Sequence, residues 1–184
     1  MSTRREFFAA RGLTLVNQAN LVDQVWADER PERPKAPVKH LDIQYTGEES
    51  LSKFKRVAEK LAGKCDKLLV TTLDDICWLL NCRGTDIDYN PVFFAYLLFD
   101  TELRADLFVD PVKVEGIKDY LESTNVTVYP YDAIDGALQF AEGDVRVGVT
   151  DECNGHLGEL VAASAVELDE NPIAHLKCEK NEVE

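Results

Sequence analysis

The side chains best suited to chemistry are crowded into one short loop, residues 83–90. Its candidate site residues are Arg83, Asp86, Tyr89 and Asn90, which offer a guanidinium, a carboxylate, a phenol and a carboxamide. In a functional interpretation, Arg83 or Tyr89 faces a ligand-binding cleft at the end of a sheet, the usual place for sites in α/β folds. In a structural interpretation, Arg83 pairs with Asp86 and the Asp and Asn side chains cap turns. The loop pattern alone leaves both interpretations open.

The residues around the loop predict how it is held. Gly84 permits a sharp turn directly after Arg83. Asp86 and Asp88 flank one residue, so they point the same way if the loop is extended. The sequence Tyr-Asn-Pro at 89–91 is typical of a turn that leads into a strand. The aromatic residues that follow at 93, 94 and 96 are expected to belong to the core, as is Trp78.

No established catalytic motif is present. The sequence lacks G-x-S-x-G, H-E-x-x-H, a P-loop and G-x-G-x-x-G, so we expect no catalytic residue and no activity from the chain alone. The five cysteines form no C-x-x-C pair, and we expect reduced, structural thiols. Cys153 with His156, and His175 with Cys178, have the ligand types of a zinc site but no recognised spacing. No metal ligand is therefore assigned in this chain.

The charge balance excludes several classes of partner. A formal net charge of −14 over 184 residues argues against nucleic acid and anionic membranes, because both repel an acidic surface. Such a surface usually serves solubility, although it would also suit a basic partner. No apolar run approaches the roughly 20 residues that span a bilayer, and residues 1–6 do not resemble a secretory signal. We expect a cytoplasmic protein with no membrane contact.

The elements that must position the loop alternate in the α/β manner. Apolar periodicity predicts helices over residues 48–62, 73–81, 111–122, 132–141 and 155–163. Strands are expected over residues 67–72, 91–99, 104–110, 125–129, 145–150 and 165–168. The strands at 91–99 and 104–110 are close in sequence and predict an antiparallel hairpin.

The two ends of the chain predict a domain organisation. Residues 1–26 carry a helix at 4–11, a short strand at 13–16 and a helix at 21–26, which together cannot build a core, so we expect the tail end of a preceding domain. Residues 27–40 contain three prolines in seven positions and are predicted to be a linker. The middle domain is expected at 41–170. Residues 171–184 predict a helix that runs to the last residue and leads into a further domain.

One stretch carries a family resemblance. Residues 76–84 (ICWLLNCRG) and 85–96 (TDIDYNPVFFAY) closely resemble the middle domain of cytosolic aminopeptidase P, the Xaa-Pro aminopeptidase, with its W-L-x-N-x-R-G-x-D-x-x-x-N-P-V-F-x-x-Y pattern. Further matches lie at 20–26 with 30–34, at 73–76 and at 177–184. The resemblance therefore covers nearly all of the chain.

The resemblance implies a creatinase N-terminal-like fold: a three-layer α/β/α sandwich on a mixed, mostly parallel sheet with one antiparallel hairpin. The family's enzymes are three-domain metallopeptidases that remove the N-terminal residue from peptides with proline second. Their third domain binds two divalent metals, usually manganese, through two Asp, one His and two Glu. This chain stops where that domain should begin, so the implied manganese ions belong outside it.

The resemblance also implies partners and leaves alternatives. The expected partners are a peptide substrate bound by the longer enzyme, the enzyme's own catalytic domain and a second copy in a homodimer. The middle domain would flank the catalytic cleft, restrict access to it and help position subunits. One alternative is a catalytically dead creatinase-fold module that binds a basic protein or peptide. Another is a piece of a prolidase-like enzyme, although the proline-rich linker and the NPVF segment favour aminopeptidase P.

Overall fold

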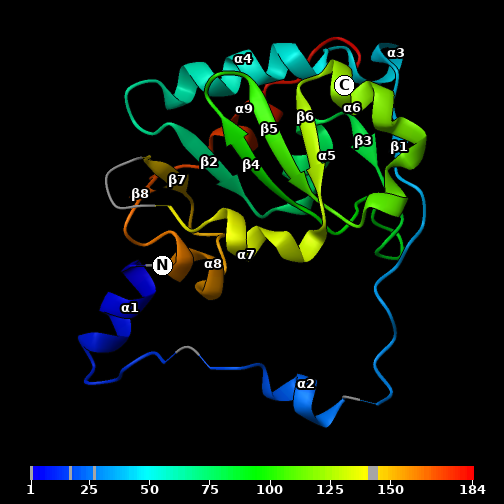
Figure 1. Cartoon of the computed structure of the whole chain (residues 1–184). Helices are drawn as coiled ribbons and strands as arrows, with labels where there is room; N and C mark the ends of the chain where they lie inside the picture. The colour runs from blue at the N-terminus through cyan, green and yellow to red at the C-terminus, as the bar shows by residue number, and fades with distance from the viewer. Residues whose placement is uncertain (1, 17, 27, 141–144) are drawn as a thin grey trace.

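A six-stranded mixed sheet forms the centre of the molecule (Figure 1). The computed structural model describes residues 2–16, 18–26, 28–140 and 145–184. The sheet has the order β6-β5-β4-β2-β7-β8. Its strands are β2 (Lys67–Val70), β4 (Tyr96–Asp100), β5 (Arg104–Phe108), β6 (Val126–Tyr129), β7 (Val147–Val149) and β8 (Ala165–Glu167). β4 is antiparallel to both of its neighbours and the other pairs are parallel, so the predicted mixed sheet with its β4–β5 hairpin is confirmed.

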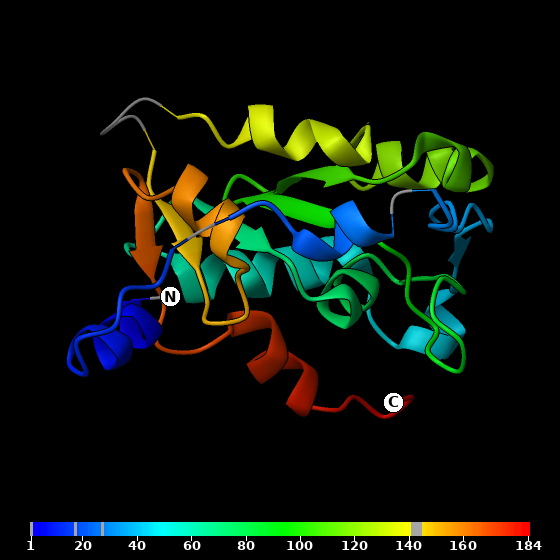
Figure 2. The same ribbon diagram turned by 90° about the horizontal axis from the view of Figure 1, so that it is seen from below.

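Helices cover both faces of this sheet and make the predicted three layers (Figure 2). Alternation along β4 sends Leu97 and Phe99 to one apolar cluster and Leu98 to another. The first cluster lies under α4 and α9, and the second lies under α7 and α8. The helices are α4 (Ser50–Leu61), α5 (Leu73–Leu79), α6 (Lys118–Ser123), α7 (Ile134–Ala137), α8 (Gly155–Leu160) and α9 (Pro172–Cys178).

A second, two-stranded sheet was not predicted. β1 (Lys39–His40) pairs antiparallel with β3 (Cys82–Arg83), just after the short helix α5. The ring of His40 stacks on that of Tyr120 at a centroid distance of 3.6 Å. The end of the proline-rich segment is thus attached to the body of the molecule, and α3 (Ile43–Thr46) follows it directly.

Two predicted elements are wrong in part. The predicted strand at 91–99 begins only at Tyr96. Pro91 has no N–H to donate, and the Phe94 N–H donates to the Asp86 carboxylate at 2.6 Å. The predicted helix at 111–122 is split into two 3-10 turns, Pro111–Lys113 and Glu115–Ile117, before α6. Valines and a glycine in this segment disfavour a continuous α-helix.

Two further helices are shorter than predicted. The segment expected to be helical at 132–141 consists of a 3-10 turn, Tyr131–Ala133, and α7, which ends at Ala137 after Gly136. Ala141, the predicted end, lies outside the described residues. The C-terminal helix α9 ends at Cys178 rather than running to residue 184. Residues 179–184 leave the helix because their side chains bind elsewhere, as described below.

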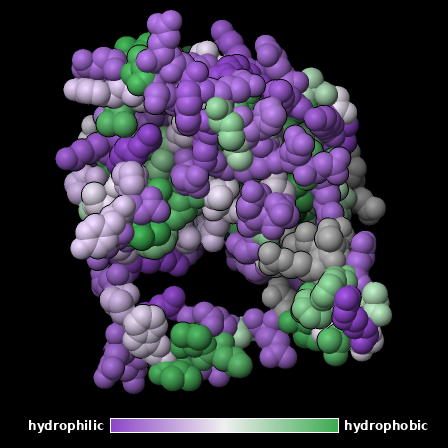
Figure 3. Space-filling view, turned by 180° about the vertical axis from the view of Figure 1, so that it is seen from behind, coloured by the Kyte–Doolittle hydropathy of each residue, from purple (hydrophilic) through white to green (hydrophobic). Residues whose placement is uncertain are grey.

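The N-terminal segment stands away from the body and exposes apolar side chains (Figure 3). α1 (Ser2–Ala9) and α2 (Leu21–Val25) are the helices of this segment, and α2 buries no residue. The predicted strand at 13–16 is wrong, because this stretch pairs with no other strand among the described residues. Ala27, the predicted start of the linker, lies outside the described residues. None of the described helices is long and apolar enough to cross a membrane.

Removing the core contact between Phe54 and Phe99 tests the layer arrangement. Both rings are fully buried and meet edge-to-face at 5.2 Å, joining α4 to the centre of the sheet. We expect Phe99→Ala to lower the free energy of unfolding by about 3–5 kcal/mol in urea denaturation followed by circular dichroism. Phe7→Ala is the control, since Phe7 is 51% exposed. Equal stability of the two variants would contradict the layer arrangement.

Candidate functional site

Arg83 is engaged with backbone carbonyl groups. Its Nη1 donates to the carbonyl oxygens of Cys77 at 2.9 Å and Cys82 at 2.8 Å. These contacts join β3 to α5, whose last carbonyls have no partner within the helix. The side chain is half-buried, and its hydrogen bonds among the described residues do not include Asp86. The Arg83–Asp86 pair of the structural interpretation is therefore wrong.

Asp86 is paired with a residue that the sequence did not suggest. Its side chain is fully buried and forms a salt bridge with Lys113, whose side chain is only 2% exposed. The same carboxylate oxygen accepts the Phe94 N–H. The second oxygen, Oδ1, is buried without a hydrogen-bond partner among the described residues. A buried ion pair of this kind fixes the loop to the 3-10 turn at 111–113.

Gly84 is required here because the backbone at Gly84 approaches Phe93 closely, and not because of an unusual φ angle. A Cβ on Gly84 would lie 2.6 Å from the Cβ of Phe93, closer than side-chain carbons pack. The Asp86 N–H donates to the Val92 carbonyl at 3.1 Å. The two arms of the loop therefore run side by side. Phe93 is buried, as predicted for a core residue.

The tip of the loop points outward. Ile87 and Asn90 form an isolated antiparallel bridge, and Tyr89 between them has φ 63°. Because the chain reverses here, Asp86 is buried while Asp88 is exposed, so the two carboxylates do not share an environment. Tyr89 is fully exposed and Asn90 is exposed. Of the four candidate residues, Tyr89 and Asn90 are thus available to a ligand, whereas Arg83 and Asp86 are used within the loop.

Sequence reasoning missed a buried lysine beside this loop. Lys53, on α4, is 1% exposed and its Nζ donates to the Trp78 carbonyl at 2.9 Å and to Asn81 Oδ1 at 2.6 Å. The ammonium lies 4.3 Å from the centre of the Trp78 ring, a cation–π contact. The spacing of Lys53 with the buried Val57 and Leu61, at i, i+4 and i+8, placed it on the core face.

Burial lowers the pKa of Lys53 to about 8, because the charged form loses its hydration. The carboxylates of Glu184 and Glu48 oppose this effect, whereas the nearby cations of Arg83 and Arg56 add to it. Asn81, with φ 50°, holds the lysine from the other side and donates its Nδ2 to the Glu48 carbonyl at 2.8 Å. Lys53 and Asn81 therefore form a buried polar cluster inside an otherwise apolar layer.

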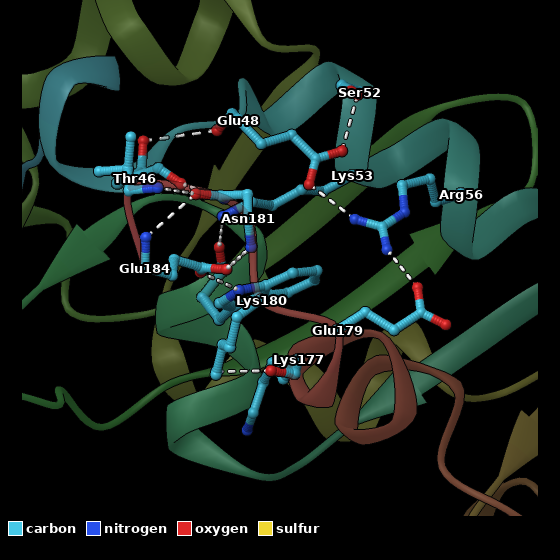
Figure 4. A network of polar contacts seen from close by, with 12 residues as sticks. Thr46, Glu48, Ser52, Lys53, Arg56, Lys177, Glu179, Lys180, Asn181 and Glu184 are labelled. Carbon is cyan, nitrogen blue, oxygen red and sulfur yellow. Dashed lines mark hydrogen bonds and ion pairs between the residues drawn. The ribbon is translucent and has the colours of Figure 1, made fainter.

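Residues 179–184, here named the C-terminal segment, dock over this lysine (Figure 4). Glu184 accepts the indole N–H of Trp78 at 3.0 Å. The Asn181 side chain donates to the Thr46 carbonyl at 2.9 Å, and its oxygen accepts the N–H groups of residues 183 and 184. A Cβ on Gly47 would collide with the Asn181 side chain.

An arginine holds the start of the same segment. Arg56 bridges Glu48 at 2.7 Å and Glu179 at 2.8 Å. Behind it, Lys177 on α9 pairs with Asp74 and Asp75 at 2.5 Å each. The pairs with Glu179 and Asp74 are partly exposed, so each contributes little alone. These ion pairs, together with the hydrogen bonds of Asn181 and Glu184, hold the C-terminal segment in one orientation against α4 and α5.

The described residues provide no metal centre of their own. They contain no group of three or more His, Cys, Asp or Glu side chains that could hold a metal ion. His156, one of the four zinc-ligand candidates, bonds Asp135 at 2.9 Å instead. All five cysteines are free, and burial raises the pKa of Cys77 to about 11 and of Cys82 to about 12. The four buried thiols, which exclude the exposed Cys178, are packing groups.

Comparisons with known proteins agree with this fold. The model of the creatinase/prolidase N-terminal domain matches residues 29–184. A probable Xaa-Pro aminopeptidase P of Laccaria bicolor is 35% identical over 172 residues, which are 90% of this chain and 26% of that protein. Another, of Neurospora crassa, is also 35% identical and covers 94% of this chain and 27% of its own length. The chain thus spans about a quarter of the length of these curated relatives.

One solved structure matches almost the whole chain. It is a crystal structure of X-prolyl aminopeptidase from Caenorhabditis elegans, described as a cytosolic enzyme with a di-nuclear active site. It shares 31% identity with a TM-score of 0.87, over 99% of this chain and 31% of that one. With the family model matching most of its length, the chain belongs to the creatinase/prolidase N-terminal domain family.

Proposed function

We propose that this chain is the non-catalytic middle domain of an Xaa-Pro aminopeptidase, a cytoplasmic metallopeptidase that removes the N-terminal residue from peptides with proline second. The observation that carries this proposal is the match to the C. elegans enzyme over 99% of the chain at 31% identity. That protein is described as cytosolic, and the curated relatives are named Xaa-Pro aminopeptidases.

We place the two divalent metals of such an enzyme outside the residues that the structure describes. The part of the chain that the structure describes offers no cluster of metal-ligating side chains. We propose that both ions, expected to be manganese, bind in a separate catalytic domain of the longer protein, where they would activate water and polarise the scissile carbonyl. No step of that chemistry is assigned to residues of this chain.

This domain would shape one wall of the catalytic cleft and orient the catalytic domain. We place the exposed tip of the loop, Tyr89 and Asn90, on the wall of the catalytic cleft, with Arg83 and Asp86 holding that tip in position. The C-terminal segment connects to the catalytic domain, and its docking on α4 and α5 fixes the angle between the two. The domain would also help to position a second copy in a homodimer.

The first test separates the domain from the enzyme. We expect the isolated chain with Mn²⁺ to leave an Arg-Pro-Pro peptide intact, whereas the longer protein with Mn²⁺ cleaves it. Release of free arginine, followed by chromatography, is the measurement. Cleavage by the isolated chain, with or without Mn²⁺, would refute the proposal, and so would a longer protein that is inactive with metal.

The second test concerns the loop. In the longer enzyme, we expect Tyr89→Ala to lower kcat/KM severalfold, because we place this side chain on the wall of the cleft. The melting temperature should not change, because the Tyr89 side chain is fully exposed. Arg83→Ala should lower stability by about 1–3 kcal/mol, because two backbone carbonyls lose their donor. Tyr45→Ala, at another exposed tyrosine, is the control. If Arg83→Ala lowers activity and leaves stability unchanged, Arg83 itself faces the cleft.

The third test uses the titration of Lys53. The pKa of Lys53 is lowered in the folded state, so the unfolded chain binds the proton more tightly between about pH 8 and the ordinary value of 10.5. The contribution of Lys53 to stability should therefore rise as pH increases through this window, and be smallest below it. Urea denaturation at several pH values should show this gain in the unmodified chain and not in Lys53→Met.

Lys55→Met is the matched control for this titration. Lys55 lies two residues further along α4 and is exposed. Its variant should follow the pH dependence of the unmodified chain. Parallel curves for Lys53→Met and the unmodified chain would show that Lys53 does not titrate in this window.

A further inference from the structure

The strand β6 leaves one edge of the large sheet open. On its inner side, the N–H groups of Ala105 and Val109 donate to the carbonyls of Asn125 and Tyr129 at 3.1 and 3.0 Å. In a parallel pair, this pattern turns the odd-numbered residues of β6 toward β5. The N–H and C=O groups of Val126 and Val128 therefore point outward, and β6 pairs with no other strand among the described residues.

A groove runs along this open edge. Its volume is about 960 Å³ including its open mouth, and it lies between β6 and the preceding helical segment. Its lining is mainly apolar, from Pro111, Val114, Leu121, Val126 and Val128, and it also includes Glu115, Lys118, Glu122 and Thr127. A strand laid beside β6 would thus turn every second side chain toward an apolar surface.

The other face of the edge is polar. Thr127 points there, next to Asp106, Asn125 and Glu122, in a second hollow. The cations of this hollow are already used, because Lys67 pairs with Asp100, and Arg104 pairs with Asp100 and Glu102. The half-buried Asp106 carboxylate has no ion-pair partner among the described residues. The Asp106 carboxylate on this face can therefore still accept a cation from a partner.

We propose that the β6 edge binds an extended segment of a partner protein in which apolar residues alternate with lysine or arginine. The segment adds a strand to the sheet through the outward groups of Val126 and Val128. Its apolar side chains enter the groove beside Val114 and Leu121, and its cations meet Asp106 on the opposite face. The net charge of −14 favours the approach of such a segment.

The test is a titration of the full chain with a fluorescein-labelled peptide, Lys-Val-Arg-Val-Lys-Val-Arg, followed by fluorescence anisotropy. We expect saturable binding, and no binding of Glu-Val-Asp-Val-Glu-Val-Asp. Amide hydrogen exchange should slow at residues 126 and 128, whose N–H groups point outward. The amides of 127 and 129 bond β5 already and should change little.

Two variants separate strand addition from attraction to an acidic surface. Val128→Pro removes one outward N–H, keeps the charge and leaves the bonds to β5, so we expect binding to weaken about tenfold or more with the melting temperature retained. Asp106→Asn removes the carboxylate that the peptide's cations meet and should weaken binding about threefold or more, whereas Glu59→Gln, with the same charge change at an exposed site on α4, should not.

Three outcomes would overturn the proposal. The first is equal binding by Val128→Pro and the unmodified chain, which would indicate non-specific attraction. The second is no binding of the basic peptide. The third is concentration-dependent self-association in analytical ultracentrifugation that Val128→Pro abolishes, which would assign the edge to a second copy of this chain.

Discussion

The buried ammonium of Lys53 is the constraint on which the turn before Arg83 and the docked C-terminal segment both depend. A charge taken out of water must be paired or hydrogen-bonded, and here the partners come from separate segments. The Trp78 carbonyl lies in the last turn of α5, Asn81 follows that helix in a left-handed conformation, and the carboxylate of Glu184 approaches from the end of the chain. Satisfying one lysine therefore orders the turn before Arg83 and the docking of the C-terminal segment together.

The local pattern of apolar residues was sufficient to predict the elements that are determined by nearby residues. The apolar stripe of α4 and the buried run of β2 predicted both elements, and the short connection between β4 and β5 predicted their hairpin. The errors occur where a side-chain contact outside the local pattern decides. The strand at 91–99 lost its first half to the Asp86 carboxylate, and α9 ended early because Asn181 bonds the Thr46 carbonyl across 135 residues. Spacing along the chain carries no record of such partners.

The position of the candidate site in the sequence was predictable. Which of its residues hold the loop together and which face solvent was not. The pattern around Arg83 correctly marked a constrained polar loop, and it offered Asp86 as the partner of Arg83 because the two are near in sequence. Burial reverses that choice, since Lys113 is the cation that reaches the enclosed carboxylate. Only a tertiary structure shows which polar groups are used internally and which, like Tyr89, face solvent.

The pair of Asp86 with Lys113 has a consequence for how these proteins evolve. Losing either charge alone leaves the other buried and unpaired, which costs about 3–5 kcal/mol, whereas replacing both with apolar residues of similar size is often close to neutral. The path from one state to the other thus passes through an unstable intermediate. The two positions should covary among relatives, as a matched acid and base or as two apolar residues, and an alignment in which they vary independently would argue against the pair.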